Sequence, residues 1–465
     1  VILAFEQGLG KTMTAIVATD TPAICVVPAL LKVNWVNELS QWRPELSTTL
    51  VEGSKPPPMQ ARKADVIVIN YDILDKHLEW LLAFGAKTLI ADEAQALKNF
   101  GAYWEARERR FVPTDTTTLR ARAFYELHWN VPKLLLLTGT PIMNRTKEIW
   151  PLLHMCNKEE WGSMRNFQTV YCGGREEKVG GRQMWKADGR TNAPELHQRL
   201  VARYMVRRTK AEVAKDLPAK SRRSIAVSMD LEHKKMYARV VRDFLRWIEE
   251  NGGPERAERV ARAEMLVRMT ALRRIAANGK APAALNWIKE HWEGTQRPLV
   301  VMGVHADALD KIAAGIDEMN KEHSRALAAG DVPDISKPIR YGRITGNVPK
   351  GKRQKTIEDF QKNGTLDLVL YSIPIATGTT LTRASEVLFI ERLWRPADQV
   401  QAEDRVHRLG QTLPVGITYL DACGTIDDKM ALLLMDKAVT AAAVIDGVDL
   451  DAKGAQDLVD RKSGV

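Results

Sequence analysis

The chain has 465 residues, of which 45% are hydrophobic and 27% charged, so it can form two to four packed units with hydrophobic cores. No apolar run approaches the length of a membrane span, and we expect no membrane partner. The net charge of +10, with a pI near 9.3, suits a polyanionic partner, although a solvated basic surface would carry the same charge.

The four cysteines argue against a zinc site. Cys25, Cys156, Cys172 and Cys423 show no Cys-x-x-Cys spacing, and no cluster of histidines accompanies them. This pattern favours a reducing, intracellular compartment. From the abundance of Ala and Arg we expect the cytoplasm or nucleoid of a bacterium, or a virus-infected cell, rather than a nucleus.

The first 150 residues alternate apolar runs with helical stretches. Four runs read as buried strands of a parallel sheet that is covered on both faces, namely Ala23–Val27, Asp65–Ile69, Thr88–Ala91 and Lys133–Leu137. Ligands of such sheets bind beyond the carboxyl ends of the strands. Asp92-Glu93 and Thr138-Gly139-Thr140 lie at these ends, so we expect them near a ligand.

The segment Gly8-Leu9-Gly10-Lys11-Thr12 has the composition of a phosphate-binding loop. The glycines let backbone N–H groups point at phosphate oxygens, Lys11 suits the β and γ phosphates, and the Thr12 hydroxyl can coordinate Mg²⁺. Phe5 occupies the position of the first glycine of the strict pattern, so a chance glycine turn before a helix is the alternative. Because Val1–Ala4 is barely a strand, we expect that the numbering begins inside a longer protein, without the segment that would grip the base.

Leu89–Gln95 reads as a buried strand that delivers two adjacent carboxylates. We expect Asp92 to hold Mg²⁺, directly or through water, and Glu93 to orient and deprotonate the attacking water. An acidic turn at a strand end is the alternative, but the preceding phosphate loop weighs against it. Thr138-Gly139-Thr140 offers two hydroxyls in a turn, and we interpret it as the element that links hydrolysis to movement between two halves of the protein.

The middle of the chain changes character. Residues 100–118 look like a loop insertion, and from 150 to about 285 helical spacing with many Arg and Trp replaces the strand pattern. Residues 199–223 carry nine basic and two acidic side chains, hence a net charge of +7. The alternation of strands and helices then returns, with expected strands at Leu299–Met302, Leu366–Tyr371, Glu386–Ile390 and Val415–Leu420. After Asp427 we expect one helix and a polar tail.

Near the end, Arg405 and Arg408 are three residues apart and would share one face of a helix. Guanidinium groups directed at a γ-phosphate stabilise its transfer and can raise the rate by about 10³–10⁵. A solvated basic face is the alternative. Lys11 is far from Arg405 and Arg408 along the chain. These three side chains could bind one triphosphate only if two domains faced each other. That arrangement is typical of an enzyme that converts nucleotide hydrolysis into domain motion.

These segments, in this order, resemble the Swi/Snf family of superfamily-two DNA-dependent ATPases over nearly the whole chain. The similar segments in the first half are Gln7–Thr12, Pro28–Trp42, Ile67–Tyr71, Asp92–Ala94 with Lys98-Asn99, and Leu137–Asn144. Those further along are Arg207–Lys210 with Leu217-Pro218, Trp394 with Pro396, and Gln401–Gln411. The last is the most specific, and its Glu403-Asp404 is most similar to the HepA-related annealing-helicase branch.

The chain departs from the family pattern at a few positions. Gln95 stands where the family usually has His, and it can hydrogen-bond across a cleft as His would. Phe5 replaces an acidic residue, Arg395 replaces a common Asn, and Thr377–Thr380 is a short version of the fifth motif. These departures bear on rate and coupling more than on the fold.

The resemblance implies an α/β fold with two RecA-like parallel-sheet lobes, at 1–150 and 286–425, a helical insertion at 151–285, and a brace helix and tail at 426–465. It implies catalytic roles for Glu93, Gln95, Arg405 and Arg408. It implies ATP contacts by Gly8, Leu9, Gly10, Lys11, Thr12, Gly378 and Gln401, with the metal at Thr12 and Asp92. It implies coupling by Thr138, Gly139 and Thr140, and DNA contacts by Asn70, Arg207, Arg208, Lys210, Thr379 and Trp394.

We therefore expect a monomeric, ATP- and Mg²⁺-dependent translocase on double-stranded or forked DNA, which remodels DNA or protein–DNA complexes, for example by fork regression or strand annealing. Basic surfaces that grip phosphates would make its binding independent of sequence and sensitive to salt. A non-catalytic nucleic-acid clamp derived from such a motor is one alternative, supported by Phe5, Gln95 and the short fifth motif. An RNA-directed helicase is another, although the closing motif and the long helical middle argue against it.

Overall fold

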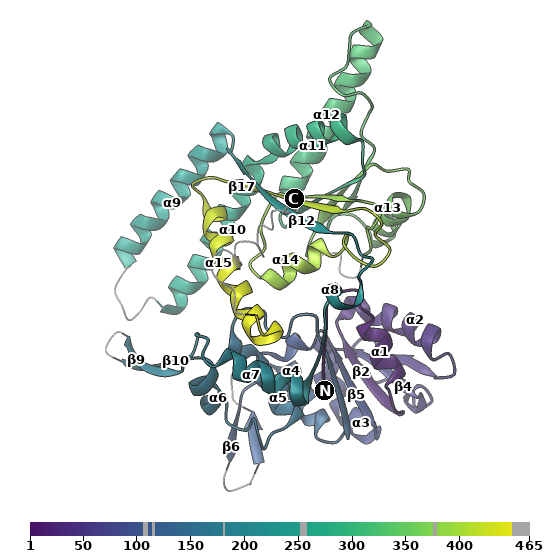
Figure 1. Ribbon diagram of the computed structural model, residues 1–465, viewed down its shortest axis with the longest axis vertical. Coiled ribbons are helices and arrows are strands. Elements are labelled where there is room, and N and C mark those ends of the chain that lie inside the picture. Colours follow the sequence, from purple (N-terminus) through teal and green to yellow (C-terminus); the bar gives the residue numbers. More distant parts are fainter. Residues whose placement is uncertain (106–109, 114–116, 180–181, 252–257, 375–378, 449–465) are drawn as a thin grey trace. The chain divides into compact units, whose positions relative to one another are not determined.

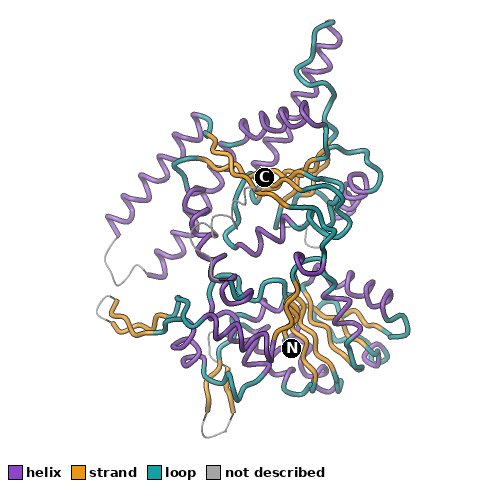
Figure 2. The backbone as a smooth tube through the Cα atoms, in the orientation of Figure 1, coloured by secondary structure: helices purple, strands orange, loops and turns teal. Residues whose placement is uncertain are grey.

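The protein is described from a computed structural model, which covers residues 1–105, 110–113, 117–179, 182–251, 258–374 and 379–448. The chain divides into two compact units. The first comprises Val1–Lys215 together with the described residues from Val439 onward, and the second comprises Asp216–Ala438. Each unit is built around one parallel sheet, whose strands are drawn in orange in Figure 2.

The sheet of the first unit has seven parallel strands in the order β11-β1-β8-β5-β2-β4-β3 (Figure 1). Their bounds are β1 (Ile2–Phe5), β2 (Ala23–Val27), β3 (Thr48–Leu50), β4 (Val66–Asn70), β5 (Thr88–Asp92), β8 (Lys133–Leu137) and β11 (Met205–Arg208). The four strands expected from their apolar runs are confirmed. β2, β4 and β5 are buried along their whole length, as continuous apolar strands of a doubly covered sheet should be.

Helices cover both faces of this sheet. The helices α1 (Lys11–Val17) and α2 (Lys32–Trp42) pack on one face, where Trp35 and Leu39 meet Cys25 and Val27 of β2. The other face is covered by α3 (Leu74–Ala83), α4 (Leu119–His128) and α5 (Trp150–Cys156). The alternation of side chains along each strand supplies the two apolar faces. The unit also contains α6 (Met164–Tyr171), α7 (Ala193–Arg199) and α8 (Lys210–Val213).

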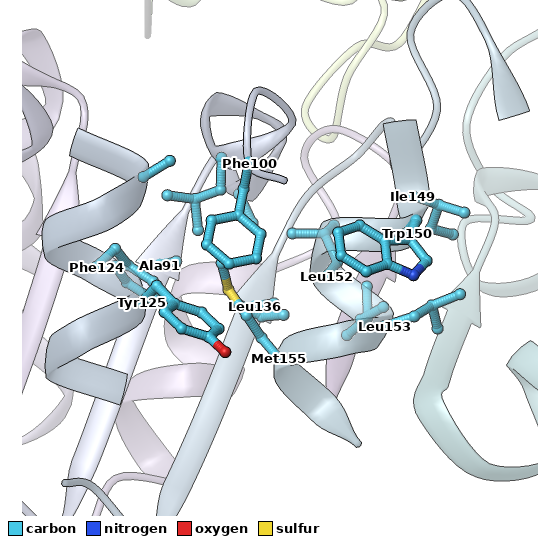
Figure 3. Packing of buried hydrophobic residues seen from close by; sticks show 14 of the residues in the cluster. Ala91, Phe100, Phe124, Tyr125, Leu136, Ile149, Trp150, Leu152, Leu153 and Met155 are labelled. Carbon is cyan, nitrogen blue, oxygen red and sulfur yellow. The ribbon is translucent and has the colours of Figure 1, made fainter. Parts of the chain in front are cut away.

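An aromatic cluster anchors the segment that follows β5 (Figure 3). Phe100 is fully enclosed, with its ring centroid 4.4 Å from that of Tyr125 on α4 and 6.2 Å from that of Trp150 on α5. Aromatic rings bury large apolar areas and favour such offset contacts. The chain that leaves the carboxylates at the end of β5 is therefore held against two helices.

The sheet of the second unit has six parallel strands in the order β12-β17-β16-β13-β15-β14. Their bounds are β12 (Lys220–Val227), β13 (Leu299–Gly303), β14 (Tyr341–Ile344), β15 (Leu368–Ser372), β16 (Glu386–Phe389) and β17 (Val415–Ala422). The four strands expected in this part of the chain are confirmed. The predicted α/β class, with two parallel-sheet lobes, is therefore correct.

Helices also cover both faces of the second sheet. One face carries α11 (Ala281–Thr295) and α12 (Ala306–Ala329), and the other carries α13 (Lys350–Gln361) and α14 (Pro396–Glu403). The antiparallel pair α9 (Leu231–Asn251) and α10 (Glu258–Gly279) precedes them, and α15 (Ile426–Ala441) follows β17. None of the helices in the described part of the chain combines the length and the apolarity needed to cross a membrane.

Several strands were not expected from the sequence. The interval 150–285 contains a hairpin, β9 (Arg175–Val179) with β10 (Arg182–Lys186), as well as the edge strands β11 and β12. These strands are rich in Arg and Lys, because an edge strand has a neighbour on one side only and tolerates polar side chains. The expected loop at 100–118 contains a second antiparallel pair, β6 (Ala102–Glu105) with β7 (Arg110–Pro113).

Candidate functional site

The turn between β1 and α1 has the backbone of an anion cradle. Gly8 and Gly10 have φ angles of 82° and 76°, in the left-handed region that favours glycine. Gly10 is the N-cap of α1, and no side chain among the described residues caps this helix. The first N–H groups of a helix have no partner within the helix, and they favour anions. Leu9 contributes its backbone N–H to Glu6 within this turn, and Thr12 lies in the first turn of α1, partly exposed.

The side chain of Lys11 lies beside the turn at residues 138–140. Its Nζ donates hydrogen bonds to the carbonyl oxygens of Phe5, at 2.7 Å, and Glu6, at 3.1 Å. A Cβ atom added to Gly139 would lie 3.2 Å from Nε2 of Gln7 and 3.5 Å from Nζ of Lys11. The turn at residues 138–140 therefore packs directly against the loop before α1. Because Gly139 has no side chain, the side chain of Lys11 has room beside it.

Asp92 ends β5 with only 7% of its surface exposed. Its Oδ2 accepts a hydrogen bond of 2.8 Å from Nε1 of Trp35, and its Oδ1 accepts one of 2.9 Å from the N–H of Glu93. Tyr71 donates its hydroxyl to the backbone oxygen of Asp92 at 2.7 Å. Burial and the charge of Glu93 raise the pKa of Asp92 to about 6, against the opposing effects of Trp35 and Lys11.

Glu93 adopts a left-handed backbone with a φ angle of 50°, which is unusual for a residue with a side chain. Such strained positions concentrate at functional sites. The Nε2 atom of Gln95 donates to Oε2 of Glu93 at 2.5 Å, and Oε1 of Gln95 accepts from the hydroxyl of Thr138 at 2.7 Å. The N–H of Thr140 in turn donates to the hydroxyl of Thr138 at 3.0 Å. A continuous chain of hydrogen bonds thus joins the expected catalytic carboxylate to the expected coupling turn.

A second network stabilises the segment after this turn. Oε2 of Glu148 accepts hydrogen bonds from the backbone N–H groups of Met143 and Asn144, at 2.9 and 2.8 Å. Its Oε1 pairs with Nζ of Lys98 at 3.3 Å. Glu148 therefore joins two of the segments that resemble the family, Lys98-Asn99 and Leu137–Asn144. The sequence alone did not indicate this glutamate.

The strand β11 brings expected DNA contacts beside the phosphate loop. Arg207 donates to Oδ1 of Asp446 at 2.8 Å and to the carbonyl oxygen of Ala4 at 2.9 Å. Oε2 of Glu6 accepts the backbone N–H of Lys210 at 2.7 Å. Arg207 therefore has structural partners within its unit, whereas the side chain of Arg208 is exposed. Asn70, at the end of β4, is buried.

In the second unit, Arg405 and Arg408 do not lie on a helix. The helix α14 ends at Glu403, and both arginines occupy the turns that follow. The N–H of Leu381 donates to the carbonyl oxygen of Arg405 at 2.8 Å, and Arg408 donates to the hydroxyl of Thr380 at 2.9 Å. The assumption of helical spacing was wrong here, because the backbone turns more tightly after Glu403, where the N–H groups of Arg405 and Val406 bond to residues three positions earlier.

The two arginines nevertheless lie close together. Burial and the positive charge of Arg405 lower the pKa of the Arg408 guanidinium below its ordinary value. The charge of Arg405 also acts on Tyr371, the pKa of which burial raises. Two guanidinium groups with reduced access to water form a favourable site for a phosphate.

The remaining expected site residues of this unit surround the same turns. Gln401 lies on α14 and is partly exposed, and Thr379 begins the described segment that leads to Thr380. Gly378 lies outside the described residues. The guanidinium of Arg273, on α10, lies 5.3 Å from the ring centroid of Trp394. Among the described residues, no group of three or more His, Cys, Asp or Glu side chains could hold a metal ion alone.

Glu403 and Gln411 have partners that the sequence did not reveal. Glu403 is fully buried and binds Arg222 of β12 through both carboxylate oxygens, at 2.8 and 2.6 Å. The Nε2 atom of Gln411 donates to the carbonyl oxygens of Ala384 and Thr382, at 2.7 and 3.1 Å. Both residues hold the arginine turns in place, rather than facing a ligand.

Comparison with known proteins gives two family matches. Residues 1–280 match the SNF2-related domain, and residues 321–410 match the helicase conserved C-terminal domain. Over the whole chain, a solved SWI2/SNF2 ATPase core from Sulfolobus solfataricus in complex with double-stranded DNA is 21% identical, with a TM-score of 0.38, and covers 100% of this chain and 93% of that chain.

Two groups of curated relatives are similar over most of the chain. The mouse protein named DNA annealing helicase and endonuclease ZRANB3 is 29% identical over 459 residues, which cover 96% of this chain and 39% of the relative. The Xenopus tropicalis protein named SWI/SNF-related matrix-associated actin-dependent regulator of chromatin subfamily A-like protein 1 is 28% identical and covers 94% and 42%. The chain thus spans about two fifths of the length of these relatives. The resemblance to the annealing-helicase branch is confirmed, and the chain belongs to the SNF2-related, or Swi/Snf, family of helicase-like ATPases.

Proposed function

We propose that this chain is an ATP-dependent translocase on double-stranded DNA that remodels DNA or protein–DNA complexes. The observation that supports this function best is the hydrogen-bonded chain from Glu93 through Gln95 and Thr138 to Thr140, beside Lys11. A carboxylate that activates water and a turn that senses its state are thereby joined. An enzyme that couples hydrolysis to movement requires such a connection.

The residues of the first unit fit a nucleotide with Mg²⁺. Asp92 and Thr12 offer oxygen atoms, the donors that Mg²⁺ prefers, and the helix N-terminus with Lys11 suits the phosphates. When bound, Mg²⁺ would neutralise charge on the β- and γ-phosphates. Glu93 would hold and deprotonate the attacking water, while Gln95 keeps the Glu93 carboxylate oriented. Gly8 and Gly10 would donate backbone N–H groups to the phosphates, and Leu9 lies between them in the same loop.

We assign Arg405 and Arg408, with Gln401 and Gly378, to binding of the triphosphate. Two neighbouring guanidinium groups would stabilise charge that develops on the γ-phosphate. Their partial burial supports this role, because a charged group with few water contacts acts strongly on a nearby anion. We propose functional lobes at 1–150 and 286–425, followed by 426–465. The intervening 151–285 adds β11 to the sheet of the first lobe and β12 to that of the second.

The DNA partner is proposed from the chain's charge and from the names of its relatives. Curated relatives are named DNA annealing helicase and endonuclease. Strand annealing and fork regression are the remodelling reactions that we propose. The candidate DNA contacts of the first unit are Asn70, Arg208 and Lys210, with Arg207 beside them. Those of the second unit are Thr379 and Trp394.

The test is ATP hydrolysis by the full-length protein with duplex DNA, forked DNA, single-stranded DNA and RNA. We expect Mg²⁺-dependent hydrolysis that rises severalfold with duplex or forked DNA and falls to background in Lys11→Ala and Glu93→Gln. Equal activity in these variants would contradict the proposal. Tight duplex binding without hydrolysis would favour a non-catalytic clamp, and stimulation by RNA alone would favour an RNA helicase.

A further inference from the structure

The helix α14 (Pro396–Glu403) lies directly before the turns that hold Arg405 and Arg408. The chain passes from the first unit to the second between Lys215 and Asp216, and back between Ala438 and Val439. The strand β12, which starts at Lys220, follows the first of these crossings, and α15 carries the second. Figure 1 labels α14, β12 and α15. Both crossing segments form polar contacts with α14 or with the residues beside it.

At the C-terminal end of α14, Glu403 is the centre of a buried ion cluster. Besides the two bonds from Arg222, it accepts a hydrogen bond of 2.9 Å from Nζ of Lys220 and one from the hydroxyl of Tyr419. Lys220 also donates to Oδ1 of Asp404 at 3.1 Å. Although burial alone would raise the pKa of Glu403, Arg222 and Lys220 lower it well below its ordinary value. The carboxylate therefore stays charged and keeps its partners.

The first crossing segment makes a second contact, before β12 begins, with the turns that hold Arg405 and Arg408. Nε2 of His407 donates a hydrogen bond of 2.8 Å to the carbonyl oxygen of Pro218. His407 lies between the two arginines, and Pro218 lies between Lys215 and Lys220. The first crossing is thus attached to the end of α14 and to the turns themselves.

At the N-terminal end of α14, the second crossing makes its own contact. Lys437 of α15 donates from Nζ to the carbonyl oxygen of Trp394 at 2.9 Å. Arg395 is the N-cap of α14, so this bond is formed immediately before the helix begins. Lys437 lies next to the crossing at Ala438. Both ends of α14 are therefore bonded to chain segments that lead to the other unit.

We propose that Glu403 and Lys437 are positioning residues, through which displacement of the two crossing segments moves α14 and sets the Arg405–Arg408 turns for hydrolysis. A buried ion cluster suits this role, because any separation leaves a charge without compensation, so that its members move as one body. This inference deepens the proposed function and rests on it. The linker would then report the relative movement of the units to the arginines.

The experiment compares Glu403→Gln and Lys437→Met with Asp367→Asn as the matched control. Asp367 also binds an arginine through two bonds, at 2.8 and 2.7 Å, but it precedes β15, the strand next to the opposite edge of the same sheet. We expect Glu403→Gln to lower duplex-stimulated turnover about tenfold with little change in KM for ATP, since the arginines that Glu403 positions would act in the transition state. Lys437→Met should lower it by a smaller factor, and Asp367→Asn should retain the stimulation of the unmodified protein.

Two further measurements separate positioning from mere loss of folding. The number of base pairs translocated per ATP hydrolysed should fall in Glu403→Gln and Lys437→Met. Partial unfolding would instead lower the rates of translocation and of hydrolysis by the same factor, so that the number of base pairs per ATP would not change. Lys437 is partly exposed, so its variant should fold even where Glu403→Gln does not. Two results would overturn the inference. One is a wild-type number of base pairs per ATP and wild-type DNA stimulation in both Lys437→Met and folded Glu403→Gln. The other is an equal loss of stimulation in Asp367→Asn.

Hydrogen exchange distinguishes failure of this inference from failure of the proposed function. In Glu403→Gln, amide exchange should accelerate in residues 404–411 and 220–227 and remain unchanged around β14. This readout needs no ATPase activity. Absence of DNA-stimulated hydrolysis in the unmodified protein would refute the proposed function, whereas unchanged exchange at these residues in the variant would refute the cluster as the support of the arginine turns.

Discussion

The hydroxyl of Thr138 donates a hydrogen bond of 2.7 Å to the amide oxygen of Gln95. The same amide donates to Glu93, so one side chain connects the ends of β5 and β8. A carboxylate can only accept hydrogen bonds, which fixes the direction of the amide. A change in the charge or position of Glu93 must therefore alter the bond to Thr138.

We expect Gln95→Leu to lower DNA-stimulated turnover about tenfold while ATP binding changes little, because Glu93 loses a donor that orients it. Gln95→His should retain most of the activity, since an imidazole can donate to one partner and accept from the other. Steady-state hydrolysis with and without duplex DNA measures the effect. Full stimulation in Gln95→Leu would show that this connection has no part in coupling.

Trp35→Phe should weaken the response to Mg²⁺ by about tenfold, a typical effect of losing a hydrogen-bond partner of a metal ligand. The variant keeps the buried ring but removes the donor to Oδ2 of Asp92. Trp42→Phe is the control, because Trp42 lies on the same helix and donates to Glu38 at an exposed site. Titration of Mg²⁺ against binding of a fluorescent ATP analogue checks the prediction, and equal curves for the two variants would contradict it.

His128 should make the first unit less stable in acid. Its side chain is buried on α4. Burial lowers the pKa of His128 to about 4, below its unfolded value. Between pH 6.5, the ordinary pKa of histidine, and pH 4, the unfolded chain binds a proton at His128 that the folded chain does not bind. The folded state is therefore most favoured above pH 6.5 and loses stability as the pH falls towards 4.

The variant His128→Phe should remove this part of the pH dependence. We expect the difference in unfolding free energy between wild type and variant to change by about 2 kcal/mol between pH 8 and pH 5, with the variant favoured in acid. Denaturant unfolding at both pH values is the measurement. Parallel pH profiles of the two proteins would show that His128 does not titrate on unfolding.

Lys280→Met should lower the unfolding free energy of the second unit by about 3–5 kcal/mol, because it leaves a buried carboxylate without its partner. Lys280 has no exposed surface, and its Nζ donates to Oδ2 of Asp427 at 2.6 Å and to the carbonyl oxygen of Leu420 at 2.8 Å. Lys289→Met, which breaks an exposed pair with Asp334, should change stability by less than about 1 kcal/mol. Thermal and denaturant unfolding compare them, and equal losses would contradict the assignment to burial.

Local sequence was sufficient for the parts of the fold that depend on local composition. Continuous apolar runs predicted the central strands, because a strand covered on both faces has no polar side to reveal. Glycine and acidic residues that follow such runs marked the turn after β1 and the carboxylates at the end of β5. The family assignment followed from the order of these segments.

The contacts that assemble the site depend on the path of the chain. Trp35 meets Asp92 across 57 positions, and Arg222 meets Glu403 across 181. No local pattern marks these partners, since hydrogen bonds between distant residues arise only when helices and strands pack. The edge strands β11 and β12 and the turns at Arg405 and Arg408 were missed for the same reason, because their conformation comes from neighbouring strands and a buried carboxylate rather than from their own composition.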